Sequence, residues 1–403
     1  MHDVAIASAA PEAGIFRAEP VSRVLEGYMT EKHRELQNRI RSKLTPQYLK
    51  SLLRDLGQGS IGHEGWKSLG DAGVIGLSVP SDMGGGGYGY MGSLLLAEHL
   101  AIHDEGGLIL GTGVQSDVAC QWLLGGPKPI CDRFLPQLLS GQLVACQCDT
   151  DPSSSERMKA ERCHEGIKLS GRKLYVINAE IADLCFVAAD LDGKPSIILV
   201  ETSRDGVSVE KVWDKLGTRN VGSASIRFED VTVPSEHVLS SHGLRQMLHW
   251  NRVMSRLRFT IAIAATTVHG ALLEHVSSYA SNRELGGRAL IAWPVNAHAF
   301  AAAQSDHLLM LGGVARCFSM MEKGNAAVSE IAQLKFFSVS HACNFASTAC
   351  DLDGGLGYMA ESKALAAYRL LRGFRMAGGS MTTMLTVTNH SLANRAETEA
   401  FEN

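Results

Sequence analysis

Several features that would point directly to a common class of protein are missing from this chain of 403 residues. The nine cysteines are irregularly spaced and contain no CxxC pair, which argues against a disulfide framework or a zinc site. We interpret Cys146-x-Cys148 and Cys163-His164 as small buried side chains and a turn rather than as metal ligands. The net charge is −4 and no long basic run occurs, so nucleic acid is not an expected partner.

We also expect neither a signal peptide nor a membrane-spanning helix. The first residues, "MHDVAIASAAPEAG", contain neither a basic segment nor a long apolar core. The longest apolar run, "FTIAIAATTVHGALLEH", is interrupted by Thr266, Thr267 and His269 and is too short to cross a bilayer. We therefore expect a buried core helix there, no membrane partner, and a cytoplasmic protein.

Neither of the common nucleotide-binding glycine motifs is present. "PSDMGGGGYGY" lacks the Lys-Ser/Thr pair of a phosphate-binding P-loop, and no GxGxxG lies within a strand-helix-strand unit. We interpret this first cluster as a turn between helices. The second cluster, "DGGLGY" at 353–358, lies between two helical segments, where it could end a helix or bring backbone amides close to a ligand.

The hydrophobic pattern of the sequence changes at two points, which predicts three domains of an α+β protein. Residues 1–142 are mostly helical in period, as in "VSRVLEGYMTEKHRELQNRIRSKL". Residues 143–239 consist of short runs rich in Val, Ile and Phe, separated by Gly, Asp, Asn and Pro, which predicts a small β domain. Residues 240–403 return to long, alanine-rich helical segments.

Five motifs, in order, resemble those of the acyl-CoA dehydrogenase superfamily. They are "FLPQLLSG" (Phe134–Gly141), "DKLGTRNVGSASIRFEDVTVP" (Asp214–Pro234), "RELGG" (Arg283–Gly287), "DGGLGY" (Asp353–Tyr358) and "GGSMT" (Gly378–Thr382). The resemblance implies an N-terminal helical domain, a middle β-barrel-like domain and a C-terminal four-helix bundle. It also implies bound FAD, a homotetramer or homodimer, and an acyl group carried on CoA or on an acyl-carrier protein.

The resemblance places the flavin against two segments of the β domain. In "CQCDTDPSSSE" it implies that Gln147, Cys148 and Thr150 face the pyrimidine ring and that Ser155 reaches the pyrophosphate. Donors at this edge would stabilise the negative charge of the reduced ring. In the second segment, the positions that the resemblance places beside the flavin are Tyr175, Ile177 and Asn178. Family members carry threonine where this chain has Ile177, so the hydroxyl that faces flavin N5 is missing here.

The same resemblance implies FAD contacts in the C-terminal region. Arg283 matches an arginine that reaches the FAD phosphates of a neighbouring subunit, and a guanidinium suits a pyrophosphate. The remaining matched positions are Gly354, Gly355, Ser380 and Thr382. A glutamine that usually precedes the glycine pair is Asp351 here, and its carboxylate would disfavour a nearby diphosphate.

The catalytic glutamate of the family is missing from both of its known positions. These positions align with Gly378 and with Leu257, while the neighbouring Arg258, near the thioester in the family, is kept. Either another residue serves as the base, with Glu284, Asp353 and His249 as candidates, or the protein does not carry out simple α,β-desaturation. Because the base and the N5-facing hydroxyl serve the same step, their joint loss favours the second interpretation.

We therefore predict an FAD-dependent oxidoreductase that acts on an acyl thioester by an atypical, O2-using oxidase or monooxygenase route of specialised metabolism. Three alternatives remain open. They are an acyl-CoA dehydrogenase with a relocated base, a flavin N-oxygenase acting on an amine, and a non-catalytic protein that binds acyl-CoA or a partner.

Overall fold

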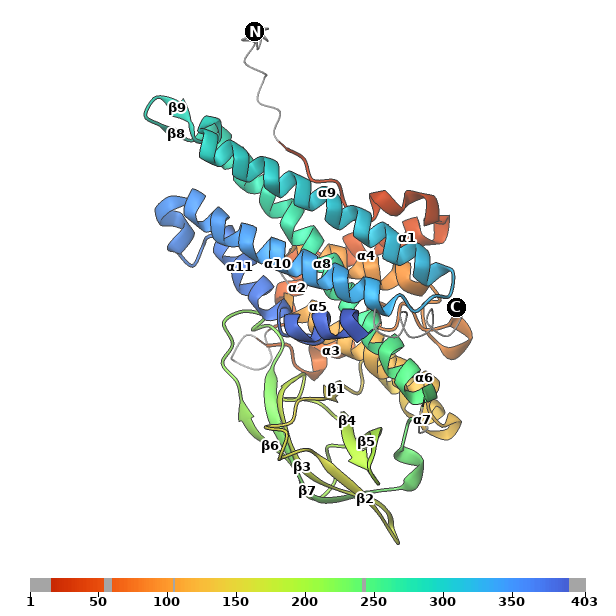
Figure 1. Cartoon of the computed structure of the whole chain (residues 1–403). Helices are drawn as coiled ribbons and strands as arrows, with labels where there is room; N and C mark the ends of the chain where they lie inside the picture. Colours follow the sequence, from red (N-terminus) through yellow and green to blue (C-terminus); the bar gives the residue numbers. More distant parts are fainter. Residues whose placement is uncertain (1–15, 54–59, 104–105, 241–243, 391–403) are drawn as a thin grey trace, which may run out of the picture.

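The computed structural model describes residues 16–53, 60–103, 106–240 and 244–390, except for the side chains of 244–247. Helices from the first and last parts of the chain pack together, and a β-sheet lies against one end of them (Figure 1). This is the expected order of a helical domain, a half-barrel of strands and a second helical domain.

The N-terminal part is a set of short helices. Their bounds are η1 (Arg23–Tyr28), α1 (Glu31–Lys43), α2 (Pro46–Ser51), α3 (His63–Asp71), η2 (Ser81–Met83), α4 (Gly89–Ile102), α5 (Gly106–Thr112), the π-helical η3 (Gly113–Ala119), α6 (Cys120–Gly125) and α7 (Lys128–Leu139). The glycine-rich segment after η2 is a turn leading into α4, as expected. The segment from Val21 to Leu44, which has helical periodicity in the sequence, is divided at Thr30, whose hydroxyl accepts a hydrogen bond from His33 N and starts α1 with a capping box.

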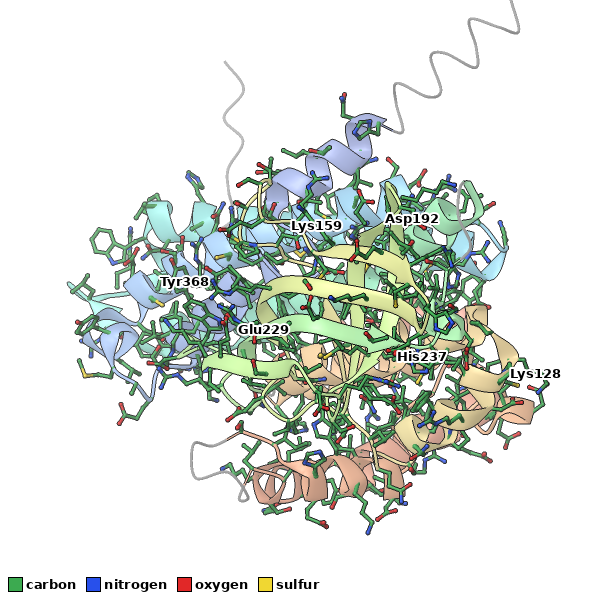
Figure 2. All side chains as sticks on the ribbon, turned by 90° about the horizontal axis from the view of Figure 1, so that it is seen from below. Lys128, Lys159, Asp192, Glu229, His237 and Tyr368 are labelled. Atoms are coloured by element: carbon green, nitrogen blue, oxygen red, sulfur yellow. The ribbon has the colours of Figure 1, made fainter. Side chains whose placement is uncertain are left out.

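The middle part is a seven-stranded sheet with the order β1-β4-β2-β3-β7-β6, and β5 pairs with β4. The strands are β1 (Ala145–Cys148), β2 (Lys159–Cys163), β3 (Gly166–Ile177), β4 (Leu184–Leu191), β5 (Lys194–Glu201), β6 (Val207–Val212) and β7 (Ser223–Val233). The side chains of one face form their own apolar core. The outer face is charged, and Figure 2 shows Lys159, Asp192 and Glu229 on this side. Six of these strands match the predicted runs, whereas β2 was not predicted.

The C-terminal part is built on one long helix. Its elements are η4 (Ser235–His237), α8 (Leu244–Asn282), β8 (Glu284–Leu285), β9 (Arg288–Ala289), η5 (Leu290–Ala292), α9 (Pro294–Glu322), α10 (Val328–Leu352), η6 (Gly354–Tyr358), α11 (Lys363–Phe374) and a last helix at 381–390. Within the described residues, only Leu248–Asn282 is long and apolar enough to cross a membrane, and 78% of its most apolar window is buried inside the protein. The expected core helix is confirmed. The hairpin β8–β9 projects from the end of α8 (Figure 1).

The end of the sheet that carries β1 and the last residues of β3 is fixed against the helices. The Asn178 amide donates to Gly111 O (3.3 Å) and Ala145 O (2.9 Å), which ties the end of β3 to α5 and to β1. Between β6 and β7, a Cβ on Gly217 would lie 2.7 Å from Arg369 O, so only glycine allows this loop to touch α11. The candidate site lies at this junction.

Candidate active site

The two positions expected to carry the base are neighbours in space. A Cβ built on Gly378 would lie 3.8 Å from Leu257 Cδ2, 3.6 Å from Arg258 Cγ and 3.2 Å from Ile261 Cδ1. The loop after α11 and the middle of α8 therefore face the same small space, and neither position places a carboxylate there. Gly378 has φ +64°, a conformation that disfavours residues with a Cβ.

Two buried cations hold the loop that contains Gly378. Arg258, only 5% exposed, donates from Nε to Gly378 O at 2.9 Å. Lys335 on α10 is fully buried and donates from Nζ to Ala377 O and Gly379 O. Three successive carbonyls thus point toward the cations, and the N–H groups of the same peptides point the opposite way. This is a fixed set of donors for a negatively polarised oxygen.

Burial sets the electrostatics of this loop. Burial, together with the charge of Arg258, lowers the pKa of Lys335 to about 7. The pKa of Arg258 is lowered by burial as well, while the negative charge of Asp149 opposes that shift. Lys335 was not predicted from the sequence, and its signal is a lone cation inside the apolar helical run "IAQLKFF".

The predicted phosphate-side residues Ser380 and Thr382 follow the loop directly. Ser380 Oγ accepts a hydrogen bond from Thr383 N at 3.2 Å and so caps the helix at 381–390. Thr382 is exposed in the first turn of that helix. Both hydroxyls therefore lie at a helix N-terminus next to the outward-facing N–H groups, an arrangement that favours negatively charged groups.

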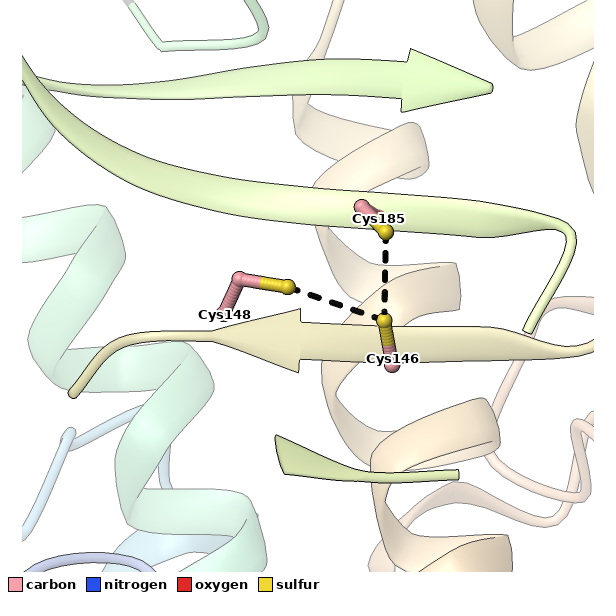
Figure 3. Close-up of side chains that lie close together, drawn as sticks. All are labelled: Cys146, Cys148 and Cys185. Carbon is pink, nitrogen blue, oxygen red and sulfur yellow. Dashed lines mark hydrogen bonds between the residues drawn. The ribbon is translucent and has the colours of Figure 1, made fainter. Parts of the chain in front are cut away.

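Strand β1 presents its two faces to different surroundings. Cys146 and Cys148 point into the β core, where Cys146 Sγ lies 3.6 Å from Cys148 Sγ and 3.4 Å from Cys185 Sγ (Figure 3). The Cys148 thiol is therefore turned away from the site, which leaves only its backbone for a ligand. Gln147 points the opposite way and accepts a hydrogen bond from Trp122 Nε1 on α6 at 3.1 Å.

The predicted flavin-facing residues of β3 lie beside the end of β1. Leu174 N donates to Thr150 O at 2.9 Å, and Thr150 itself is exposed. Tyr175 has φ +57°, is 58% exposed, and lies against Trp213 with ring centroids 4.9 Å apart. Ile177 is half-buried at the end of the strand. An open aromatic pair beside two strand ends offers a surface to a planar ligand.

Ser155 lies farther along the same loop. It is exposed, and its hydroxyl lies 2.9 Å from Ser153 Oγ. It lines a shallow hollow of about 650 Å³ together with Arg157 and Lys159.

Three predicted cofactor residues lie far from this group within the chain. Arg283 follows the end of α8, about 40 Å along the helix axis from Leu257 at 1.5 Å per residue. Gly354 and Gly355 are exposed in η6, beyond the end of α10. Roughly 25–30 Å of helix separates them from Lys335. One chain therefore does not bring all of the predicted FAD contacts together.

The three alternative bases named from the sequence lie elsewhere. Glu284 is exposed in the projecting hairpin, next to Arg283. Asp353 is buried against Ser362 Oγ at 3.4 Å, and burial raises its pKa. His249 packs edge-on against Trp122 with ring centroids 4.9 Å apart, and burial lowers its pKa. At 1.5 Å per residue it is about 12 Å along α8 from Leu257.

The site has polar groups that lack partners within the chain. Arg258 Nη1 and Asn178 Oδ1 are buried and have no hydrogen-bond partner among the described residues. Orphaned groups of this kind are costly unless a ligand or water satisfies them. Together with the exposed Tyr175 and the outward-facing N–H groups of the 377–379 loop, they fit a planar ligand with polar edges, such as a flavin.

Comparisons with known proteins match the order of the three domains. Three family models describe successive parts of the chain: acyl-CoA dehydrogenase N-terminal domain (residues 30–142), middle domain (148–231) and C-terminal domain (243–392). Isovaleryl-CoA dehydrogenase of Pongo abelii is 25% identical over 356 residues, covering 84% of this chain and 83% of that protein. Human very long-chain specific acyl-CoA dehydrogenase is 29% identical over 78% of this chain, which spans about half (51%) of that relative.

Solved structures show the same fold at lower identity. Glutaryl-CoA dehydrogenase from Mycobacterium smegmatis, solved in complex with FADH2, has a TM-score of 0.80 at 20% identity, covering 93% of this chain and 96% of that one. The prolyl acyl carrier protein oxidase AnaB has a TM-score of 0.80 at 21% identity, covering 90% and 99%. With all three domain models matched in order, the chain belongs to the acyl-CoA dehydrogenase family.

Proposed function

We propose that the protein is an FAD-dependent oxidoreductase that oxidises an acyl thioester by an atypical, O2-using oxidase or monooxygenase route. The observation that carries the proposal is the pairing of Gly378 with Leu257. Both family positions for the base meet in one space, and neither supplies a proton acceptor. The aliphatic Ile177, at the position where the family has a hydroxyl, supports the same conclusion.

FAD supplies a two-electron acceptor when it is bound. The residues that would hold its ring are Gln147, Thr150, Tyr175 and Ile177, with the backbone of Cys148. The Asn178 amide nitrogen is held by Gly111 O and Ala145 O, which fixes the strand end and leaves only its Oδ1 for a ligand.

The thioester would lie against Arg258 and the 377–379 loop. Arg258 keeps one buried Nη1 without a partner, and the outward N–H groups of the loop can hold a carbonyl oxygen. Both features suit a thioester on CoA or on a carrier protein. The prolyl acyl carrier protein oxidase AnaB has this fold, and its name describes an oxidase that acts on a carrier-bound acyl group.

A homodimer or homotetramer is part of the proposal. Arg283 lies about 40 Å from Leu257 along α8, so the phosphate contact expected of it needs a second copy of the chain.

The test is the visible spectrum of the purified protein, followed by anaerobic titration with acyl thioesters on CoA and on a carrier protein, and then by admission of isotopically labelled O2. A flavin band that persists with the thioester alone, with labelled oxygen found in the product once a reduced nicotinamide and a flavin reductase are supplied together with O2, supports a monooxygenase. Anaerobic bleaching followed by rapid recovery in air supports an oxidase.

Three other outcomes contradict the proposal. Anaerobic bleaching that recovers only with an artificial electron acceptor, and not with O2, indicates an ordinary dehydrogenase. Labelled oxygen transferred to an amine, with no response to any thioester, indicates an N-oxygenase. A protein without a flavin band, even after incubation with FAD, is a non-catalytic binding protein.

A further inference from the structure

Proton removal from the substrate needs an acceptor that neither Gly378 nor Leu257 supplies. We propose that Asp149, at the end of β1, is the carboxylate that accepts the proton from the α-carbon of the acyl thioester. The proposal rests on the proposed oxidation of a thioester at this site. It places the base on a strand of the β domain rather than on α8 or on the loop after α11.

The alternation of β1 turns Asp149 toward the site. Cys146 and Cys148 share the face that points into the β core, and Gln147 shares the opposite face with Asp149. Gln147 contacts Trp122 on α6, which shows that this face looks toward the helices. Asp149 therefore follows the strand at the point where the sheet meets η3 and α6.

One oxygen of Asp149 is anchored and the other is open. Gln147 Nε2 donates to Asp149 Oδ1 at 2.6 Å, and Gln147 Oε1 is itself held by Trp122 Nε1. Asp149 Oδ2 has no hydrogen bond within the described part of the chain and is not sealed from solvent. A carboxylate held by one oxygen, with the other free, is what a general base requires.

The charges around Asp149 connect it to the 377–379 loop. Arg258, which donates to Gly378 O, also favours the ionised form of Asp149 through its charge, so the carboxylate and the loop share one neighbouring cation. Burial raises the pKa of Asp149 to about 6, while Gln147 and the charges of Lys173 and Arg258 oppose the shift. The carboxyl is thus ionised at neutral pH but is more basic than an ordinary aspartate, as proton abstraction favours.

A second buried carboxylate near α8 does not fit the same role. Asp117 Oδ1 accepts from Ser93 Oγ at 2.7 Å, and its Oδ2 accepts from Thr260 Oγ1 at 3.0 Å. Both oxygens are engaged and the residue is only 3% exposed. Asp117 therefore has both carboxylate oxygens hydrogen-bonded, and it links η3 to α4 and α8.

The proposed step is a reversible proton transfer. The α-C–H bond breaks, its electron pair stays on the substrate as an enolate, and the proton binds Asp149 Oδ2. The outward N–H groups of the 377–379 loop, whose carbonyls are held by Arg258 and Lys335, stabilise the enolate oxygen. No oxidant is needed for this half of the reaction, so it can be measured separately from electron transfer.

The experiment measures deuterium exchange into acetyl-CoA and phenylacetyl-CoA in D2O by mass spectrometry. Neither thioester has a β-hydrogen, so deprotonation is possible and desaturation is not. The purified full-length protein is compared with Asp149→Asn and Asp149→Glu, with the exposed Asp205→Asn as the matched control. Equilibrium dialysis reports thioester binding, and circular dichroism reports folding.

The expected result is exchange by the wild type and by Asp205→Asn, a loss of about 100-fold or more in Asp149→Asn, and partial activity in Asp149→Glu. The wild-type rate should rise with pH through an inflection near 6. If Asp149→Asn does not fold, Gln147→Leu provides the second measurement. It should shift that inflection upward, because the Gln147 hydrogen bond lowers the pKa of Asp149.

Two results would overturn the inference while leaving the proposed function in place. They are exchange by Asp149→Asn at the wild-type rate, and wild-type binding of both thioesters without exchange. A wild-type protein that binds neither these thioesters nor any from the spectral titration contradicts the proposed function itself, and the inference with it.

Discussion

Replacing Lys335 by methionine tests whether its buried amine holds the loop that contains Gly378. Methionine fills a similar volume and keeps the apolar stem, but it removes both hydrogen bonds to Ala377 O and Gly379 O. Lys335 itself is fully buried, so no water is at hand to replace the lost donors. The substitution therefore isolates the polar role of the side chain.

The magnitude follows from the two carbonyls. A buried polar group left without its partner costs about 1–3 kcal/mol, so losing both donors should lower the free energy of unfolding by about 2–6 kcal/mol. Part of this loss is offset because the variant no longer buries an amine whose charged form is disfavoured.

The pH dependence has a definite sign. Burial lowers the pKa of Lys335 from 10.5 to about 7 in the folded protein. Between these values the unfolded chain binds the extra proton, so this residue makes the wild type more stable as the pH rises from about 7 to 10.5. The stability difference between the wild type and Lys335→Met should therefore grow across this window.

The assay is denaturant unfolding of the wild type, Lys335→Met and the exposed control Lys159→Met at a series of pH values from 7 to 10. Lys159→Met should stay within about 0.5 kcal/mol of the wild type. A change below about 1 kcal/mol in Lys335→Met at pH 10, where the offset from the buried amine is smallest, or a difference that shrinks as the pH rises, would refute the reasoning.

Three further predictions concern single positions. Gly378→Ala should lower the free energy of unfolding by about 1–2 kcal/mol, because φ is +64° and Ile261 Cδ1 would lie 3.2 Å from the new Cβ. Gly73→Ala is the control, with φ +69° and open space around the new Cβ, and it should cost less in the same denaturation assay. Burial lowers the pKa of His269 to about 3 from 6.5, so the unfolded chain binds the extra proton between these values and stability falls as the pH drops through this range. His269→Leu should flatten that decline in urea unfolding at pH 4–7. Tyr175→Ala should lower the flavin content per chain, read from the visible absorbance, with little change in melting temperature, because the ring is 58% exposed.

The order of domains was predictable because each has its own local pattern. Strands such as β4 and β5 are continuous apolar runs, and α8 and α10 carry apolar residues at helical spacing. Strand β2 escaped prediction because "KAERC" is almost entirely exposed, so it has no apolar alternation to reveal it.

The candidate site was predictable only in part. The loss of a carboxylate at Gly378 and Leu257 could be inferred from aligned motifs, but their contact depends on how α8 packs against the loop after α11. Lys335 and Asp149 were missed for a related reason. Their roles depend on the direction of a side chain and on the burial around it, and neither is encoded in a local pattern.

The predicted Cys148 contact shows the same limit at finer scale. Its position beside a flavin-facing strand could be aligned, but strand alternation sends the thiol into the β core. Neighbouring side chains of one motif therefore point to opposite faces of the strand, and only the structure shows which of them face the site.

The cysteine thiols differ in their accessibility, so they can report which parts of the protein open. Cys163, at the end of β2, is exposed, whereas Cys146, Cys148 and Cys185 are sealed in the core of the sheet. Others are buried among helices, as Cys120 and Cys343 are. A sealed thiol reacts with a soluble reagent only when its surroundings open, so its labelling rate measures a local opening free energy. Timed alkylation and peptide mapping would thus compare the stability of the β domain with that of the helical domains in one unmodified chain.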